Sequence, residues 1–294
     1  MEIRSTWSRT RKARHENCEL GFFLDYRVQT RPTVSGLKIP WDIVNSVSRF
    51  AIRKHLKSIK EIKNPIDRNS IDYWIDKNLT DMSYQNNVRL KTREIMLENR
   101  SKNIEYIDQI FHAKFLNYIG KRVKSFFQIT EIANLNPNSN FYLVDEFIPV
   151  DVQGVELISK PDLIMEKGDR FRLIKFIVQK AIINDQTFLR DLILLWALNN
   201  KFLPNRPDKF EVTIYTWDGS GWDVVQFLGD TFDSESMIFG LQKDISKFNQ
   251  TMSKGSREGI NSLRASTSLQ YCKSCNHYDF CGRNDVTEMR PNLS

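Results

Sequence analysis

Residues 154–164 have the sequence GVELISKPDLI, and after the polar residues 166–170, EKGDR, the chain continues as FRLIKFIV over residues 171–178. Both outer runs are rich in apolar and β-branched residues, and Gly168 in the polar segment suits a tight reversal of the chain. The pattern predicts two strands joined by a turn, with Asp162 at the start of the buried part. We expect the rest of the fold to be arranged around this hairpin.

The hairpin carries only half of a two-carboxylate metal centre. The hairpin resembles that of metal-dependent nucleases of the PD-(D/E)XK superfamily, in which one Asp after the first strand and an acid-x-Lys motif on the second converge, because residues i and i+2 of a strand share a face. The two acids hold Mg²⁺, and the lysine orients water or stabilises the developing phosphate charge. Asp162 is present, but Lys175 stands where the acid is needed and Ile177 where the lysine is needed.

Composition indicates a globular protein with a polyanionic partner. The chain has 294 residues, of which 40% are hydrophobic and 27% charged, with 43 basic and 36 acidic residues and a net charge of +7. The charge favours binding to DNA. We find no apolar run long enough to span a bilayer, and residues 1–14 are too charged for a signal peptide. A cytoplasmic location without a membrane partner follows as the expectation.

Outside the hairpin, the pattern is helical first and then mixed. Helices are predicted from Arg9 to Glu16 and, between Pro40 and Phe127, around residues 71–77, 87–99 and 104–127. A strand at 141–147, an apolar helix at 186–199, a second hairpin of residues 210–217 and 222–227, and a helix at 234–252 follow.

Basic side chains recur on the predicted helices of the first half. They could line a groove that follows a phosphate backbone, although cations of this kind are more often simply a solvated helix face. The candidate nucleic-acid-binding residues are Arg49, Arg53, Lys54, Lys57, Lys114, Lys121, Arg122 and Lys124.

The cysteines form the strongest local motif. Cys272, Cys275 and Cys281 have the spacing C-x2-C-x5-C, and Cys18 is the fourth and last cysteine of the chain. In a reducing compartment they are not expected to form disulfides, so their clustering points to a metal. Four thiolates suit a [4Fe-4S] cluster or a structural zinc ion, with His277 as a substitute ligand for zinc. Spacing alone leaves both metals open.

Four features occur together in the sequence: Cys18 near an aromatic N-terminal helix, the Pro-Asp at residue 162, the apolar helix after the second strand and the C-terminal cysteine motif. Together they resemble the RecB/AddB-like iron-sulfur nucleases of the PD-(D/E)XK superfamily, which include CRISPR-associated RecB-like exonucleases. The resemblance covers almost the full length. It implies an α/β fold with a mixed β-sheet core flanked by helices, a helical N-terminal region and a C-terminal cluster segment. It also implies that Cys18, Cys272, Cys275 and Cys281 hold one [4Fe-4S] cluster that ties the two ends of the domain together.

The resemblance further implies a division of the chain into four parts. These are an N-terminal segment with the first cluster cysteine (1–40), a helical region (41–135), a PD-(D/E)XK-like core (136–252) and a C-terminal cysteine segment (253–294).

The departures from the family pattern fall in the nuclease centre. The family's His soon after a Gly is missing, since Gly36 is followed by no His before His55. Its Gln-x3-Tyr on the later helix aligns with Asp191 and Leu195. The acids retained are Asp162 and either Glu146 or Asp145, and a displaced lysine such as Lys160 or Lys180 could rescue some activity.

We therefore expect a catalytically degenerate, nucleic-acid-binding subunit of a DNA-processing, defence or recombination complex, in which the replacement of the acid-x-Lys motif argues against nuclease activity. Asp162, Glu146 and Lys175 would be the remnant of the centre. One alternative is a working DNA exonuclease with a rearranged centre, which would then bind Mg²⁺ or Mn²⁺. A second alternative is a structural scaffold that binds no nucleic acid.

Overall fold

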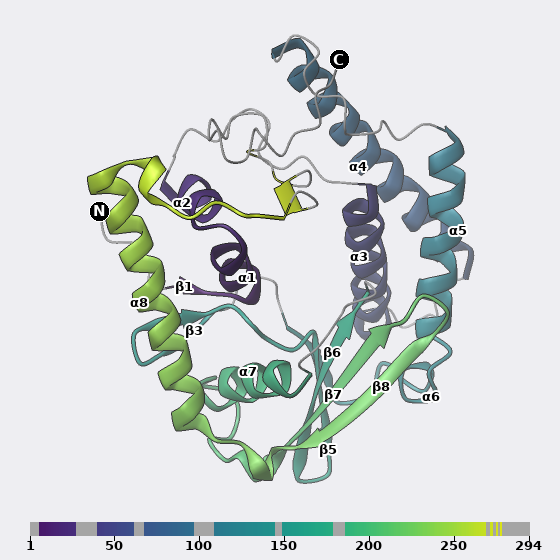
Figure 1. Cartoon of the computed structure of the whole chain (residues 1–294). Helices are drawn as coiled ribbons and strands as arrows, with labels where there is room; N and C mark the ends of the chain where they lie inside the picture. Colours follow the sequence, from purple (N-terminus) through teal and green to yellow (C-terminus); the bar gives the residue numbers. More distant parts are fainter. Residues whose placement is uncertain are drawn as a thin grey trace.

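The computed structural model describes residues 6–27, 40–61, 68–96, 109–144, 149–178, 186–268, 271, 272, 275 and 277, and it has a mixed α/β architecture (Figure 1). In chain order the elements are β1 (Thr6–Trp7), α1 (Arg9–Asn17), α2 (Glu19–Arg27), α3 (Pro40–Glu61), α4 (Arg68–Met96), α5 (Gln109–Phe126), α6 (Thr130–Ala133), β2 (Phe141–Leu143), β3 (Val150–Val152), β4 (Val155–Leu157), β5 (Leu163–Lys167), β6 (Arg170–Ile177), α7 (Gln186–Leu198), η1 (Pro207–Lys209), β7 (Phe210–Trp217), β8 (Trp222–Leu228), η2 (Gly229–Thr231), α8 (Ser234–Glu258) and η3 (Ile260–Ser262). This confirms the α/β class.

The larger sheet has five strands in the order β2-β5-β6-β7-β8. Only β6 and β7 are parallel, and the other neighbours are antiparallel. Parallel neighbours cannot be joined by a short turn, and α7 lies between β6 and β7 in the chain as the crossover. The observed elements α7, β7 and β8 lie close to the predictions of a helix at 186–199 and a hairpin of residues 210–217 and 222–227.

The prediction of one strand over residues 154–164 is wrong. Its first part forms β4 in a three-stranded sheet of order β1-β4-β3, and its last part begins β5 in the larger sheet. Pro161 lies in the break and has no backbone N–H for a ladder hydrogen bond. The hairpin is therefore β5–β6, with Gly168 at φ 64° in its turn. Asp162 lies immediately before β5, at the point where the chain passes from one sheet to the other.

Two long helices also differ from the prediction. Helix α4 is continuous, whereas separate helices at 71–77 and 87–99 are expected from the sequence. Ile75, Leu79 and Met82 continue one inward-facing stripe through the expected gap, because they are spaced at i, i+4 and i+7. Helix α8 extends to Glu258, beyond the predicted end at Met252, and stops at Gly259, whose φ is 84°. The division into four parts stays a prediction.

The larger sheet lies between two hydrophobic cores. On β6, Leu173 belongs to the core shared with α2, α7, α8 and the small sheet, whereas Ile174 belongs to the core shared with α3, α4, α5 and α6. Consecutive residues of a strand point to opposite faces, so the apolar run of β6 serves both cores. Within the described residues, none of the helices combines the length and the apolar character that a membrane span requires.

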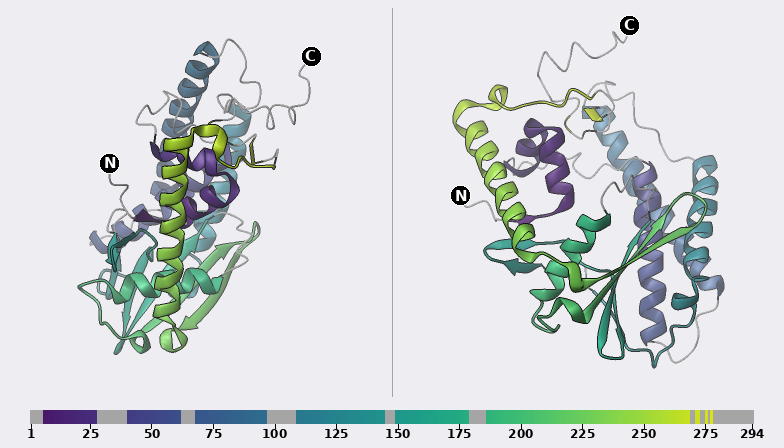
Figure 2. Two further views of the ribbon diagram at one scale, coloured as in Figure 1. Left: turned by 60° about the vertical axis from the view of Figure 1, so that its left-hand side comes forward. Right: turned by 60° about the horizontal axis from the view of Figure 1, so that its bottom comes forward.

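Helix α8 lies beside α1 and α2, as both views in Figure 2 show. Gly255 of α8 makes this approach possible, because a Cβ atom there would lie 2.6 Å from the Phe23 ring of α2 and 2.8 Å from Leu263. We expect Gly255→Ala to lower the free energy of unfolding by about 1–3 kcal/mol, since it overpacks a full core. Gly240→Ala on the same helix is the matched control, because its Cβ would meet nothing within 4 Å.

Gly240→Ala should stabilise by about 0.5–1 kcal/mol, since glycine is a poor helix former. Urea unfolding of the two variants checks the contrast between the two positions. Equal effects at Gly255 and Gly240 would contradict the close packing of α8 on α2.

Candidate metal centre and buried carboxylate site

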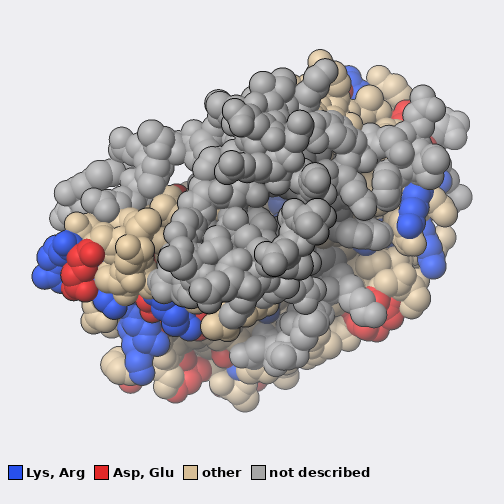
Figure 3. Space-filling model, turned by 45° about the horizontal axis from the view of Figure 1, so that its top comes forward, with Lys and Arg blue, Asp and Glu red and all other residues tan. Residues whose placement is uncertain are grey.

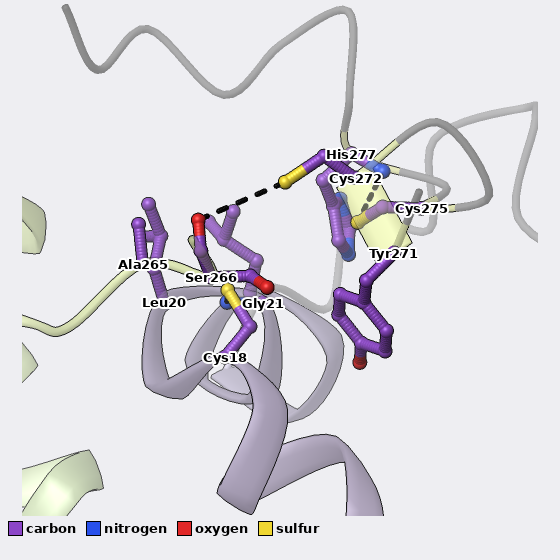
Figure 4. Close-up of a pocket in the computed structure, with 10 residues that line it drawn as sticks. Cys18, Leu20, Gly21, Ala265, Ser266, Tyr271, Cys272, Cys275 and His277 are labelled. Carbon is purple, nitrogen blue, oxygen red and sulfur yellow. Dashed lines mark hydrogen bonds between the residues drawn. The ribbon is translucent and has the colours of Figure 1, made fainter. Parts of the chain in front are cut away.

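Cysteines from the two ends of the chain line one pocket (Figure 4). Cys18 is the C-cap residue of α1 and is buried, whereas Cys272 and Cys275 follow the segment after α8. All three are free thiols. The pocket contains about 340 Å³ of space, part of it open to solvent. Cys281, the remaining member of the predicted set, lies outside the described residues.

Hydrogen bonds hold the two chain ends beside each other independently of the cysteines. The backbone N–H of Leu20 donates to the carbonyl of Arg264 at 3.2 Å, and the N–H of Arg264 donates to Glu19 Oε2 at 3.1 Å. The Arg264 guanidinium also donates to the carbonyl of Glu16 at 2.8 Å. The C-terminal segment is therefore fixed against the α1–α2 junction, where Cys18 lies.

The donor atoms of the pocket fit a thiolate-bound metal. Cys18, Cys272 and Cys275 supply three sulfur ligands, which is the chemistry that zinc and iron-sulfur clusters require. Among the described residues, no group of three His, Cys, Asp or Glu side chains has the geometry of a bound ion. The pocket thus gathers suitable donors without arranging them as a finished site.

Arg14 of α1 contacts the edge of this pocket. Its guanidinium donates to Cys275 Sγ at 3.2 Å, to the Tyr271 hydroxyl oxygen at 2.9 Å and to Asp25 Oδ2 at 2.7 Å. Burial acts to lower the pKa of Arg14, but Cys275, Tyr271 and Asp25 outweigh it and raise that pKa above its ordinary value. Arg14 therefore stays protonated and brings a fixed positive charge to the sulfur of Cys275.

His277 also lines the pocket, and Asp25 holds it. Its Nε2 lies 2.6 Å from Asp25 Oδ1. Burial acts to raise the pKa of Asp25, but the contacts with His277 and Arg14 lower it overall, so Asp25 remains a carboxylate. A carboxylate that bonds one ring nitrogen is the usual partner of a metal-ligating imidazole. His277 is thus the described residue best placed to replace a cysteine in a zinc site.

The second candidate site is Asp162, which is buried with none of its surface exposed. Arg49 of α3 donates to its Oδ1 at 2.5 Å, and Lys175 of β6 lies 3.2 Å from its Oδ2. The Nη1 atom of Arg53 lies 3.8 Å from Oδ1, and the backbone N–H of Phe176 donates to Oδ2 at 3.1 Å. Basic side chains from α3 and β6 therefore surround the position where a catalytic cation would be held.

These contacts set the charge state of the site. Burial alone would raise the pKa of Asp162, but Lys175 and Arg49 outweigh it and lower that pKa below its ordinary value. Burial lowers the pKa of Lys175, which Asp162 partly opposes and Arg49 reinforces. Among the described residues, no further carboxylate joins Asp162 in a group that could hold a metal ion.

The other residues considered for the nuclease centre differ in their surroundings where the structure describes them. Glu146, Asp145 and Lys180 lie outside the described residues. Lys160 is buried, and its carbonyl accepts a hydrogen bond from Lys175 at 3.0 Å. Asp191 forms an ion pair with the adjacent Arg190 at 2.6 Å, and Leu195 is buried in the core beneath α7.

The eight basic candidates differ in their exposure and in their partners. Arg49 and Arg53 contact Asp162, and Arg122 is buried, where it donates to Asn45 Oδ1 at 2.9 Å. Burial lowers the pKa of Arg122 to about 10. Lys124 forms an exposed ion pair with Asp72 at 2.9 Å. The other exposed members are Lys54, Lys57, Lys114 and Lys121.

On the face drawn in Figure 3, the described Lys and Arg side chains form separate groups at its two sides, with acidic residues nearby. The described part of that face therefore has no single continuous basic track. The exposed lysines of α3 and α5 are the described candidates for contacts with phosphate groups.

Two features of these sites are invisible in the sequence. Arg14 and Cys275 are separated by 261 positions, and Arg49 and Asp162 by 113. The sequence gives one signal, the spacing of Arg49 and Arg53. Four residues apart on a helix, they share one face and could act together. No protein-family model matches the chain, and no curated protein matches it.

Proposed function

We propose that the chain is a nucleic-acid-binding protein with a PD-(D/E)XK nuclease-like fold and a thiolate-bound [4Fe-4S] cluster, in which the nuclease centre has lost its metal. The observation that carries this proposal is the set of basic side chains around Asp162. Arg49 and Lys175 contact both oxygens of a buried carboxylate that a nuclease of this type would use to bind Mg²⁺. Positive charge from the protein then replaces the positive charge of the ion.

The path of the chain agrees with the proposed fold. Asp162 directly precedes β5, and Lys175 lies on the antiparallel neighbour β6, where Asp162 N–H donates to the carbonyl of Ile174 at 2.7 Å. This is the relative placement that an Asp and an acid-x-Lys motif need for a shared metal. The placement therefore supports the proposed fold. The residue types differ from that motif, which argues against metal-dependent cleavage.

The metal proposal rests on the pocket at the chain ends. Cys18, Cys272, Cys275 and Cys281 would hold the cluster, and the cluster would supply a covalent link between the α1–α2 junction and the C-terminal segment. The first three line one pocket, which supports the set. Zinc held by the three described cysteines and His277 is the alternative, because Asp25 holds the imidazole as a second-layer carboxylate would.

A working nuclease remains the alternative function. It would need Glu146 beside Asp162, because in-line cleavage assisted by metal ions demands more than one carboxylate ligand. Among the described residues, no group of three or more His, Cys, Asp or Glu side chains could hold a metal ion. We therefore propose a binding role, as a subunit that acts with protein partners on DNA.

Binding to nucleic acid is expected to depend on the exposed lysines of α5. Lys114 and Lys121 lie seven residues apart on one helix and are both exposed. Reversing both to Glu should weaken binding to labelled single-stranded DNA and reduce the steepness of its salt dependence. Each phosphate contact adds about 0.7 to the log-log slope for a single strand, so losing two contacts should reduce the slope by about 1.4.

The matched control reverses Lys201 and Lys243, two exposed lysines outside α3 and α5, and it changes the net charge by the same amount. Fluorescence anisotropy with single- and double-stranded DNA at two salt concentrations measures the effect. An absence of binding at low salt would favour the scaffold alternative. Equal weakening by the two double variants would show attraction by net charge alone and would contradict a site on α5.

A further inference from the structure

The side chain of Arg14 links the N-terminal helices to the cysteine segment. It is 14% exposed, and each of its three nitrogen atoms has its own acceptor. Asp25 accepts from Nε, Tyr271 from Nη1 and Cys275 from Nη2. The guanidinium carbon also lies 5.6 Å from the centre of the Tyr271 ring. A planar group held at all three of its nitrogen atoms has little freedom to turn away from the sulfur.

Gly21 of α2 provides the space for this arrangement. A Cβ atom at Gly21 would lie 2.6 Å from Nη2 of Arg14 and 2.7 Å from its guanidinium carbon. The same glycine donates its backbone N–H to Cys18 Sγ at 3.2 Å and lines the pocket. The missing side chain at Gly21, next to Cys18, therefore leaves room for the Arg14 guanidinium, which contacts Cys275.

We propose that Arg14 is a positioning residue of the metal centre, which holds the sulfur of Cys275 by a charged N–H donor and keeps it in place as a ligand. The inference rests on the metal centre of the proposed function and adds a residue to it that is not itself a ligand. A charged hydrogen bond to sulfur offsets part of the negative charge that several thiolates bring together. Asp25 accepts a hydrogen bond from Nε of the same guanidinium at 2.7 Å.

Replacing Arg14 should weaken metal binding more than it weakens the fold. Loss of a partner in the second layer around a metal typically lowers metal affinity about 10- to 100-fold. We expect Arg14→Gln to show a loss in this range when anaerobically purified protein competes with a chelator. Arg14→Lys should recover part of it, because it keeps the charge but loses the forked geometry. Arg9→Gln is the matched control, since Arg9 is an exposed arginine of the same helix.

Gly21→Ala tests the same contact without removing any charge. The new methyl group must push the guanidinium away from Cys275, whereas alanine favours the surrounding helix. We therefore expect a folded protein with weakened metal binding, which covers the case in which Arg14→Gln folds poorly. If the bound group is a cluster, both variants should shift its reduction potential to more negative values, because potentials depend on hydrogen bonds to the sulfurs.

The outcomes separate the inference from the proposal on which it rests. Wild-type protein that binds neither iron nor zinc would overturn both. Wild-type protein that binds metal, with unchanged affinity and potential in Arg14→Gln and Gly21→Ala, would overturn the inference and leave the metal centre standing. A lower melting temperature of the metal-free variants with no change in metal affinity would assign Arg14 a purely structural role and would also overturn the inference.

Discussion

Cys18→Ser is expected to release the bound metal and to remove a large part of the stability of the protein. Cys18 is buried at the α1–α2 junction, whereas the other described cysteines of the pocket lie more than 250 residues further along the chain. A metal that binds only the folded protein stabilises it by about 4 kcal/mol at a thousand-fold excess over its dissociation constant. For a chain of this size we expect a fall in melting temperature on the order of 10 °C.

The control for this prediction is removal of the metal from wild-type protein. A chelator should lower the melting temperature of the wild type to that of Cys18→Ser and should leave the variant unchanged, because both treatments remove the same link. Elemental analysis of protein purified without oxygen distinguishes the metals. Iron with acid-labile sulfide supports the cluster, whereas zinc alone would favour the set that includes His277. A chelator that destabilises wild type and variant equally would contradict a role for Cys18.

Local patterns in the sequence predicted the elements whose signals are local. The apolar helix over α7 and the hairpin β7–β8 were accessible because their spacing and turn residues lie within short windows. The break at Pro161 was missed because both β4 and β5 are apolar, and nothing within the window shows that they belong to different sheets. For α4, by contrast, a local signal exists, because the apolar spacing of Ile75, Leu79 and Met82 continues across the expected gap, and these residues face the core that α4 shares with α3 and α5.

The candidate sites show the same division between local and distant information. The four cysteines are expected to hold one metal centre, which stays a prediction, and three of them line one pocket. Arg122 was expected among surface cations, but its donation to Asn45 and its position near the Trp217 ring follow from the packing of α5 on α3 and β7. The use of Arg49 and Arg53 around Asp162 was also not predictable, since the partners come from separate elements.

The basic side chains around Asp162 lead to a second large expected effect, on the stability of the protein. Asp162→Asn leaves Arg49, Arg53 and Lys175 facing one another without the carboxylate that compensates them. Breaking a buried ion pair by removing one partner typically costs about 3–5 kcal/mol. We expect a value near the lower end, about 3 kcal/mol, because the side chain of Arg49 is 41% exposed and can turn toward water.

The effect of Asp162→Asn should depend on pH in a defined direction. The pKa of Asp162 is lowered on folding, so its ionised form stabilises the protein above the ordinary carboxyl value of 3.8. That contribution is lost as the pH falls through the lower pKa of the folded state. Urea unfolding should therefore show a full difference between wild type and variant near pH 7 and a shrinking difference below about pH 4.

Lys175→Met combined with Asp162→Asn tests whether the charges act together. Removing Lys175 from the variant takes away one of the opposed cations, so the double variant should be more stable than the sum of the single changes predicts.

Both wild type and Asp162→Asn should fail to cleave DNA in Mg²⁺ or Mn²⁺, because in the proposed function basic side chains occupy the place of the metal ion. Robust cleavage by the wild type that Asp162→Asn abolishes would contradict this account and establish Asp162 as a metal ligand.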